Sequence, residues 1–145
     1  MIGYTQLQTD DCGDCLASSI ECILELPLGT LPRPVDGELD TEDRWLGYRE
    51  RLRAALRPLN AWLVEISGRD EVGAPLTPPG WAVGGFAKPA VLPDGRLHAL
   101  VCKDGDPVHD THPGLRRLVG LHEWGRAQCW DLLTPIDPQR PVGRP

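Results

Sequence analysis

Two distant segments of the chain carry the side chains best suited to nucleophilic chemistry. The first segment, residues 6–17, places the thiols of Cys12 and Cys15 just before a stretch with helical periodicity. Free backbone N–H groups and the helix dipole stabilise negative charge at a helix N-terminus. A thiol in this place is favoured as a thiolate, and the same N–H groups can stabilise an oxyanion.

The second segment, residues 97–110, supplies a base and a carboxylate. Asp104-Gly105 is a dipeptide typical of the tip of a tight hairpin turn. Counted outward from that tip, His98 and Asp110 lie close to cross-strand positions, where side chains on one face meet. The carboxylate of Asp110 would then orient the imidazole of His98 and stabilise its protonated form while a cysteine gives up its proton.

The elements that must position these groups are helices first and strands afterwards. Apolar residues at three- and four-residue steps predict one helix over residues 14–26 and a second from residue 40 or 41 to residue 57, each followed by a proline. Tight turns between the later segments indicate antiparallel strands. This order predicts an α+β fold, in which an N-terminal helix carrying the cysteine packs on a twisted antiparallel sheet carrying His98 and Asp110. The segments with strand character are residues 61–66, 80–86, 97–102, 107–110, 118–121 and 129–133.

Length and composition fit one domain. A chain of 145 residues, 41% of them hydrophobic, is long enough to bury a core. We predict a single domain over residues 1–135. The proline-containing residues 136–145 are expected to form a flexible C-terminal tail.

The charge distribution excludes several classes of partner. The net charge is −6, and the first 43 residues hold ten acidic side chains and a single basic one, Arg33. Nucleic-acid binding needs a basic face, so we expect none. No segment approaches the roughly 18 apolar residues of a membrane span, and the N-terminus lacks the pattern of a secretory signal. We therefore expect a cytoplasmic protein whose five cysteines are free thiols.

Both segments resemble a known family. Residues 12–16, Cys-Gly-Asp-Cys-Leu, resemble the Cys-Gly-Ser-Cys-Trp segment of papain-like cysteine proteases, in which the second cysteine is the nucleophile. Residues 98–113, His-Ala-Leu-Val-Cys-Lys-Asp-Gly-Asp-Pro-Val-His-Asp-Thr-His-Pro, are similar to a segment of small bacterial and phage papain-fold proteins. The chain is also similar to the double-glycine leader peptidases, which have a glutamine before Asp-Cys-Gly.

The resemblance spans residues 6–115 and implies a papain-like fold with a Cys–His–Asp triad. It implies Cys15 as nucleophile, His98 as base and Asp110 as the partner of the base, with a glutamine at the oxyanion. The expected reaction is cleavage of a peptide, isopeptide or amide bond through a thioester, on a peptide, protein-conjugate or amide substrate. We expect no cofactor and no metal.

The choice of glutamine and cysteine stays open between two pairs. Gln8 lies seven residues before Cys15, whereas Gln6 lies six before Cys12, the spacing of papain-like enzymes. Cys15 is preferred because the helical stripe begins immediately after it and Gly13-Asp14 have the composition of a helix cap. Gln8 is then the expected oxyanion donor, and Cys12 with Gln6 is the alternate pair.

Three acids flank these thiols, Asp10, Asp11 and Asp14. Like charge opposes thiolate formation, so the helix terminus and the protonated His98 must outweigh it. The same acids would favour cationic substrates over anionic ones.

Two other functions are compatible with these residues. A non-catalytic binding module would keep the fold and use its cleft for a partner. Alternatively, Cys12 and Cys15 would be half of a zinc site. The remaining ligands would come from His98, His109 or His112, because a second Cys-x-x-Cys pair is missing.

Overall fold

The structure is a computed structural model that describes residues 1, 3, 14–35, 38, 40–87, 97–112 and 119–143. Its architecture confirms the predicted α+β class, with an N-terminal helix and an antiparallel sheet. None of the helices in these ranges is both long and apolar enough to cross a membrane. The elements in chain order are α1 (Cys15–Leu24), α2 (Glu42–Leu56), the 3-10 helix η1 (Arg57–Leu59), β1 (Ala61–Ser67), β2 (Trp81–Ala87), β3 (Leu97–Lys103), β4 (Asp106–His109), the 3-10 helix η2 (Leu121–Glu123) and β5 (Ala127–Pro135).

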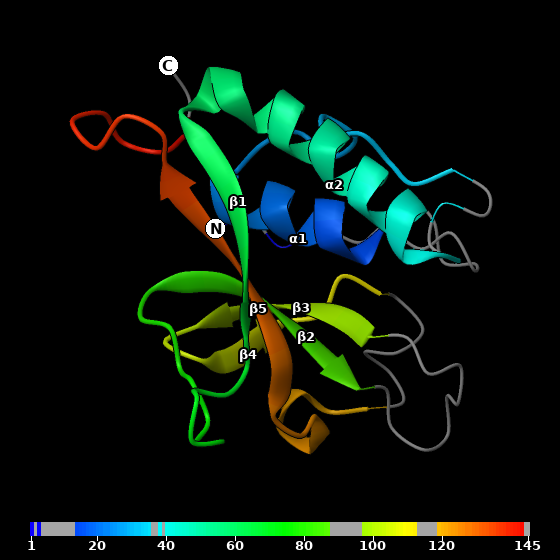
Figure 1. Ribbon diagram of the computed structural model, residues 1–145, viewed down its shortest axis with the longest axis vertical. Coiled ribbons are helices and arrows are strands. Elements are labelled where there is room, and N and C mark those ends of the chain that lie inside the picture. The colour runs from blue at the N-terminus through cyan, green and yellow to red at the C-terminus, as the bar shows by residue number, and fades with distance from the viewer. Residues whose placement is uncertain are drawn as a thin grey trace.

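The five strands form one sheet in the order β1-β5-β2-β3-β4, and every neighbouring pair is antiparallel. The last strand of the chain therefore lies between the first two. Figure 1 shows β1 and β5 running along the length of the molecule while β2 and β3 run across it, as expected of a strongly twisted sheet. Asp104 and Gly105 form the β3–β4 turn with φ values of 51° and 87°, the backbone that an Asp-Gly pair favours.

Local signals account for the helix boundaries. The hydroxyl of Thr41 accepts a hydrogen bond from the backbone N–H of Arg44 and caps the start of α2. The acidic Glu42 follows, next to the positive end of the helix dipole. Helix α1 ends at Leu24, and Glu25 takes up a left-handed conformation with φ 54° before Pro27.

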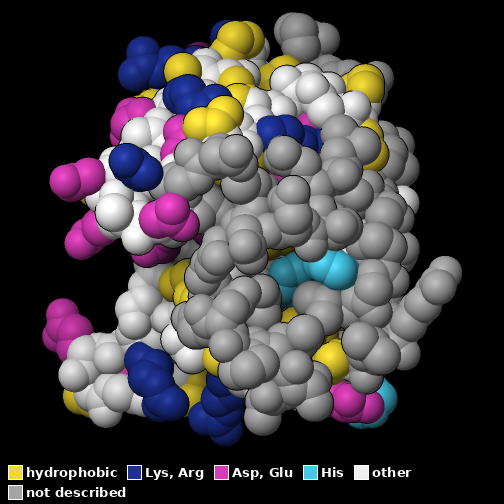
Figure 2. Space-filling view, turned by 90° about the vertical axis from the view of Figure 1, so that its right-hand side faces the viewer, with side chains coloured by type: hydrophobic (Ala, Val, Ile, Leu, Met, Phe, Trp, Pro, Cys, Tyr) yellow, Lys and Arg dark blue, Asp and Glu magenta, His cyan; other side chains and the backbone are white. Residues whose placement is uncertain are grey.

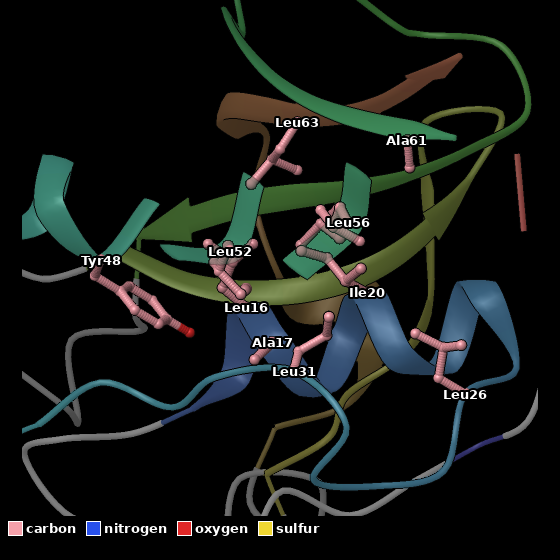
Figure 3. Close-up of a cluster of buried hydrophobic side chains, with 12 residues drawn as sticks. Leu16, Ala17, Ile20, Leu26, Leu31, Tyr48, Leu52, Leu56, Ala61 and Leu63 are labelled. Atoms are coloured by element: carbon pink, nitrogen blue, oxygen red, sulfur yellow. The ribbon is translucent and has the colours of Figure 1, made fainter. Parts of the chain in front are cut away.

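Both helices contribute to one core on a face of the sheet (Figure 3). Helix α1 packs on β3 and β2, and α2 packs on β1. Burial of each large aliphatic side chain contributes about 1.5–3 kcal/mol, so this core fixes α1 firmly against β3. The large aliphatic side chains that these elements contribute to it are those of Leu16 and Ile20 from α1, Leu52 and Leu56 from α2, and Leu63 from β1.

A second core covers the opposite face and corrects one predicted strand. The ring of Phe86 packs edge-to-face on Trp124 and Trp130, with centroids 6.3 and 6.2 Å apart. Residues 119–126 cross this face without pairing in the sheet, so the strand predicted over residues 118–121 is wrong where the chain is described. Burial of Val119 and Trp124 directs the segment across the sheet, and Leu121–Glu123 form a 3-10 turn between them.

The C-terminal segment is held by one asparagine. The side-chain amide of Asn60 donates to the carbonyl oxygens of Asp137 and Arg140, and its oxygen accepts from the N–H of Asp137. Val142 packs against the helix-side core. The composition predicts a flexible tail over residues 136–145, and this stays a prediction. Residues 136–141 are exposed, and their backbone is joined to Asn60 by these hydrogen bonds.

Candidate active site

A buried histidine–aspartate pair lies at the open end of the β3–β4 hairpin. The Nε2 atom of His98 is 2.8 Å from Oδ1 of Asp110, and both side chains are almost fully buried. The same Oδ1 accepts the backbone N–H of His112 at 2.8 Å. The two residues are not ladder partners, because the last pair of the hairpin is Val101 with His109. Asp110 follows that pair, and its side chain reaches across to the imidazole.

The thiol of Cys15 meets the same imidazole from α1. Cys15 is the first residue of the helix, and its sulfur is hydrogen-bonded to the His98 side chain and to the backbone N–H of Ala99. Since Asp110 occupies Nε2, the ring nitrogen left for the thiol is Nδ1. The structure thus brings together the cysteine, histidine and aspartate that the sequence singles out.

The surroundings favour a thiolate–imidazolium pair. Burial raises the pKa of the Cys15 thiol, but the hydrogen bond and charge of His98, with the N–H of Ala99, outweigh it, so the pKa lies below its ordinary value. Burial lowers the pKa of His98, yet its bonds to Asp110 and Cys15 raise it to about 9. The lowered pKa of the thiol and the raised pKa of the imidazole both favour a negatively charged sulfur beside a protonated ring.

Trp124 covers the histidine. Its indole stacks on the imidazole of His98 with centroids 5.3 Å apart and an interplanar angle of 28°. The ring of His112 lies edge-on to the same imidazole at 6.0 Å. These rings keep water from the His98–Asp110 bond, and a dry environment strengthens that bond.

The charge next to the nucleophile is compensated inside the protein. Asp14 occupies the N-cap position of α1 without capping the helix with its side chain. Its carboxylate instead pairs with Arg33 at 2.5 Å, and Arg33 also binds Glu21 at 2.7 Å. The negative charge of Asp14 raises the pKa of Cys15, so its pairing with Arg33 favours the thiolate. Asp10 and Asp11, the other acids flanking the thiol, lie outside the described residues.

A cleft of about 420 Å³ gives access to the sulfur. Its walls come from both helices and from β1, β2, β3 and β5, and a cavity of this size holds a small ligand or a few peptide side chains. Figure 2 shows one face of the molecule, on which histidine side chains reach the surface. The cleft is lined by Cys15, Leu16, Trp45, Tyr48, Glu65, Val83, Gly85, Leu97, Ala99, Gln128, Cys129 and Asp131.

Cys15 differs from the other described cysteines. Burial raises the pKa of Cys102 to about 12 and that of Cys129 to about 11. Cys22 is fully buried in α1. No disulfide joins these four residues.

Some of the predicted site residues lie outside the described part of the chain. Cys12, Gln6 and Gln8 fall in residues 4–13, so the alternate nucleophile and the oxyanion glutamine stay predictions. Within the described ranges, no three His, Cys, Asp or Glu side chains converge as metal ligands would. The zinc alternative needs Cys12 and is not addressed by this finding.

Sequence reasoning missed three side chains around the site. Arg33 had a signal, since it is the one basic residue among the first 43. The spacing of Tyr48 within its helix predicts only a position on the apolar face, and nothing in the sequence around Trp124 indicates contact with His98. Both reach the site only through tertiary packing.

The charge of Asp110 is expected to set the pKa of His98. Asp110→Asn keeps an oxygen that accepts both N–H groups but removes the negative charge. We expect the pKa of His98 to fall from about 9 by roughly one unit, equivalent to about 1.4 kcal/mol. An NMR titration of the imidazole C–H signals measures this shift directly. An unchanged pKa would mean that Asp110 acts only as a hydrogen-bond acceptor.

Comparisons of the chain with protein-family models, with curated proteins and with solved structures found no match. The basis for assigning a function is therefore the chemistry of the site itself.

Proposed function

We propose that the protein is a cysteine hydrolase of the papain-like type, with Cys15 as nucleophile, His98 as acid and base, and Asp110 as the group that orients His98. The observation that carries the proposal is the 2.8 Å bond from His98 Nε2 to Asp110 on a ring whose other side meets the Cys15 thiol. A buried histidine alone has a structural explanation. A thiol of lowered pKa at a helix N-terminus beside a carboxylate-bound imidazole is the arrangement of an activated nucleophile.

The first half of the proposed reaction forms a thioester. The Sγ of Cys15 attacks the carbonyl carbon of a peptide, isopeptide or amide bond, and the π electrons of the carbonyl move to its oxygen. The backbone N–H groups at the start of α1 stabilise this oxyanion. His98 then gives the proton on Nδ1 to the leaving amine, and the C–N bond breaks.

The second half regenerates the thiolate. His98, now neutral, takes a proton from water, and the resulting hydroxide attacks the thioester carbonyl. Collapse of the intermediate breaks the C–S bond and releases a carboxylic acid. The side chain of Asp110 accepts the hydrogen bond of Nε2–H and holds the ring in the tautomer that both steps need.

Selective alkylation tests the proposal. At pH 6 an ordinary thiol with a pKa of about 8.5 is only about 0.3% ionised. We expect iodoacetamide to label Cys15 first at this pH, because its pKa is lowered. Cys102 and Cys129, whose pKa values are raised to about 12 and about 11, serve as internal controls. Peptide mapping by mass spectrometry gives the rate at each sulfur.

Each other outcome of this experiment has a definite meaning. Slow and equal labelling of all five cysteines would contradict the proposal and favour a binding module that uses the cleft without chemistry. Rapid labelling of Cys12 in place of Cys15 would assign the nucleophile to the alternate pair. Stoichiometric zinc that protects the thiols and is lost in Cys12→Ser would support the metal site instead.

A further inference from the structure

Tyr48 presents an unsatisfied hydroxyl to the cleft. The residue lies on α2, is 1% exposed, and lines the same cavity as Cys15. Its hydroxyl has no hydrogen-bond partner in the part of the chain that the structure describes. A buried polar group without a partner costs about 1–3 kcal/mol. Phenylalanine would fill the same space without this cost, so the hydroxyl is placed for a partner that arrives with a ligand.

The hydroxyl points toward the helix that carries the nucleophile, and both residues line one cavity. Figure 3 shows the ring of Tyr48 extending from α2 with its oxygen directed toward α1. Burial and, next in size, the negative charge of Cys15 raise the pKa of Tyr48. The oxygen therefore lies within electrostatic reach of the sulfur.

Neighbouring side chains hold the ring in this direction. The indole of Trp45 packs on it with centroids 5.6 Å apart, and the guanidinium of Arg51 lies 5.5 Å from its centroid on another side. A donor fixed before the reaction costs no reorganisation when charge develops. A phenol that stays protonated is suited to donate a hydrogen bond rather than to accept a proton.

We propose that the Tyr48 hydroxyl donates a hydrogen bond to the oxyanion that forms when Cys15 adds to a carbonyl group, which makes Tyr48 a further catalytic residue. This role rests on the proposed hydrolase function. A lone pair of Sγ forms the C–S bond while the carbonyl π pair moves to oxygen. When the intermediate collapses, that pair restores the C=O bond and the leaving group departs with its bonding electrons. The phenolic proton stays on Tyr48 throughout.

Two reagents separate this role from a structural one. p-Nitrophenyl acetate acylates a thiolate through an oxyanion and releases p-nitrophenolate, whereas iodoacetamide alkylates the same sulfur by displacement at carbon, with no oxyanion. In the full chain with Tyr48→Phe, we expect acylation of Cys15 to slow by about 100-fold, the loss typical of one oxyanion donor. Alkylation at pH 6 should keep the wild-type rate. Trp62→Phe, an aromatic substitution outside the cleft, should leave the ratio of the two rates unchanged.

The stability of the variant gives an independent readout. Tyr48→Phe removes a buried hydroxyl that has no partner among the described residues, so the midpoint of urea unfolding should stay the same or rise. Unchanged acylation would overturn the role of Tyr48. Equal slowing of acylation and alkylation would also overturn it, because Tyr48 would then act on the sulfur or on the fold. If iodoacetamide does not label Cys15 selectively in the wild-type protein, the proposed hydrolase function is contradicted, and the role of Tyr48 with it.

Discussion

Replacing His98 with glutamine is expected to slow the alkylation of Cys15 at pH 6 by about 100-fold or more, since an ordinary thiol is almost un-ionised at this pH. The hydrogen bond and charge of His98 are the strongest influences that lower the pKa of the Cys15 thiol. Without them burial dominates, and burial raises that pKa. Glutamine keeps an N–H donor for Asp110, so the buried carboxylate is not left without a partner.

The pH dependence identifies the cause of the loss. The wild-type and variant alkylation rates should converge only when the pH exceeds the raised thiol pKa of the variant, because both sulfurs then ionise. Acylation by p-nitrophenyl acetate should stay slow at neutral pH for the same reason as alkylation. His122→Gln is the matched control, because the His122 side chain is 86% exposed and its replacement should leave the alkylation rate of Cys15 unchanged. A variant at position 98 that alkylates as fast as wild type at pH 6 would show that His98 does not activate Cys15.

The parts of the fold that follow from local chemistry could be predicted from the sequence. Both helices end before prolines, and the β3–β4 hairpin forms around Asp104-Gly105, because these residues restrict the backbone whatever surrounds them. The strand order could not be predicted. Strands β1 and β5 are the first and last strands of the chain, and they pair over seven residue pairs. Only tertiary packing selects a pairing between segments so far apart in sequence.

The same distinction applies to the candidate site: some of its contacts follow from local sequence, and others depend on tertiary packing. His98 and Asp110 were predictable as neighbours because a single tight turn separates them. Their meeting with Cys15 depends on where α1 packs against β3, which the shared core decides. The stacking of Trp124 on His98 depends on burial of Val119 and Trp124 against the opposite face of the sheet, and no local pattern indicates that burial.

The ion cluster of Arg33, Asp14 and Glu21 is expected to make a large contribution to the stability of the domain. Arg33 binds Asp14 and Glu21, whose side chains have no exposed surface, while its own is 15% exposed. Removing one partner of such a cluster leaves buried charge uncompensated. We expect Arg33→Met to lower the free energy of unfolding by about 3–5 kcal/mol, a large part of the stability of a small domain.

Urea unfolding of matched variants tests whether charge, rather than lost packing, causes this effect. Glu21→Gln in the Arg33→Met background removes one of the two uncompensated carboxylates and should recover part of the stability, whereas Arg126→Ala, at an exposed position, should change little. Stability equal to wild type in Arg33→Met would mean that the cluster is held by its surroundings and not by the guanidinium.

The same variant has a second consequence. Asp14 raises the pKa of Cys15, so loss of its paired cation should slow alkylation at pH 6 even under conditions where the protein stays folded. A partly buried arginine in the segment after α1 would thereby contribute both to the stability of the domain and to how readily the first residue of α1 ionises.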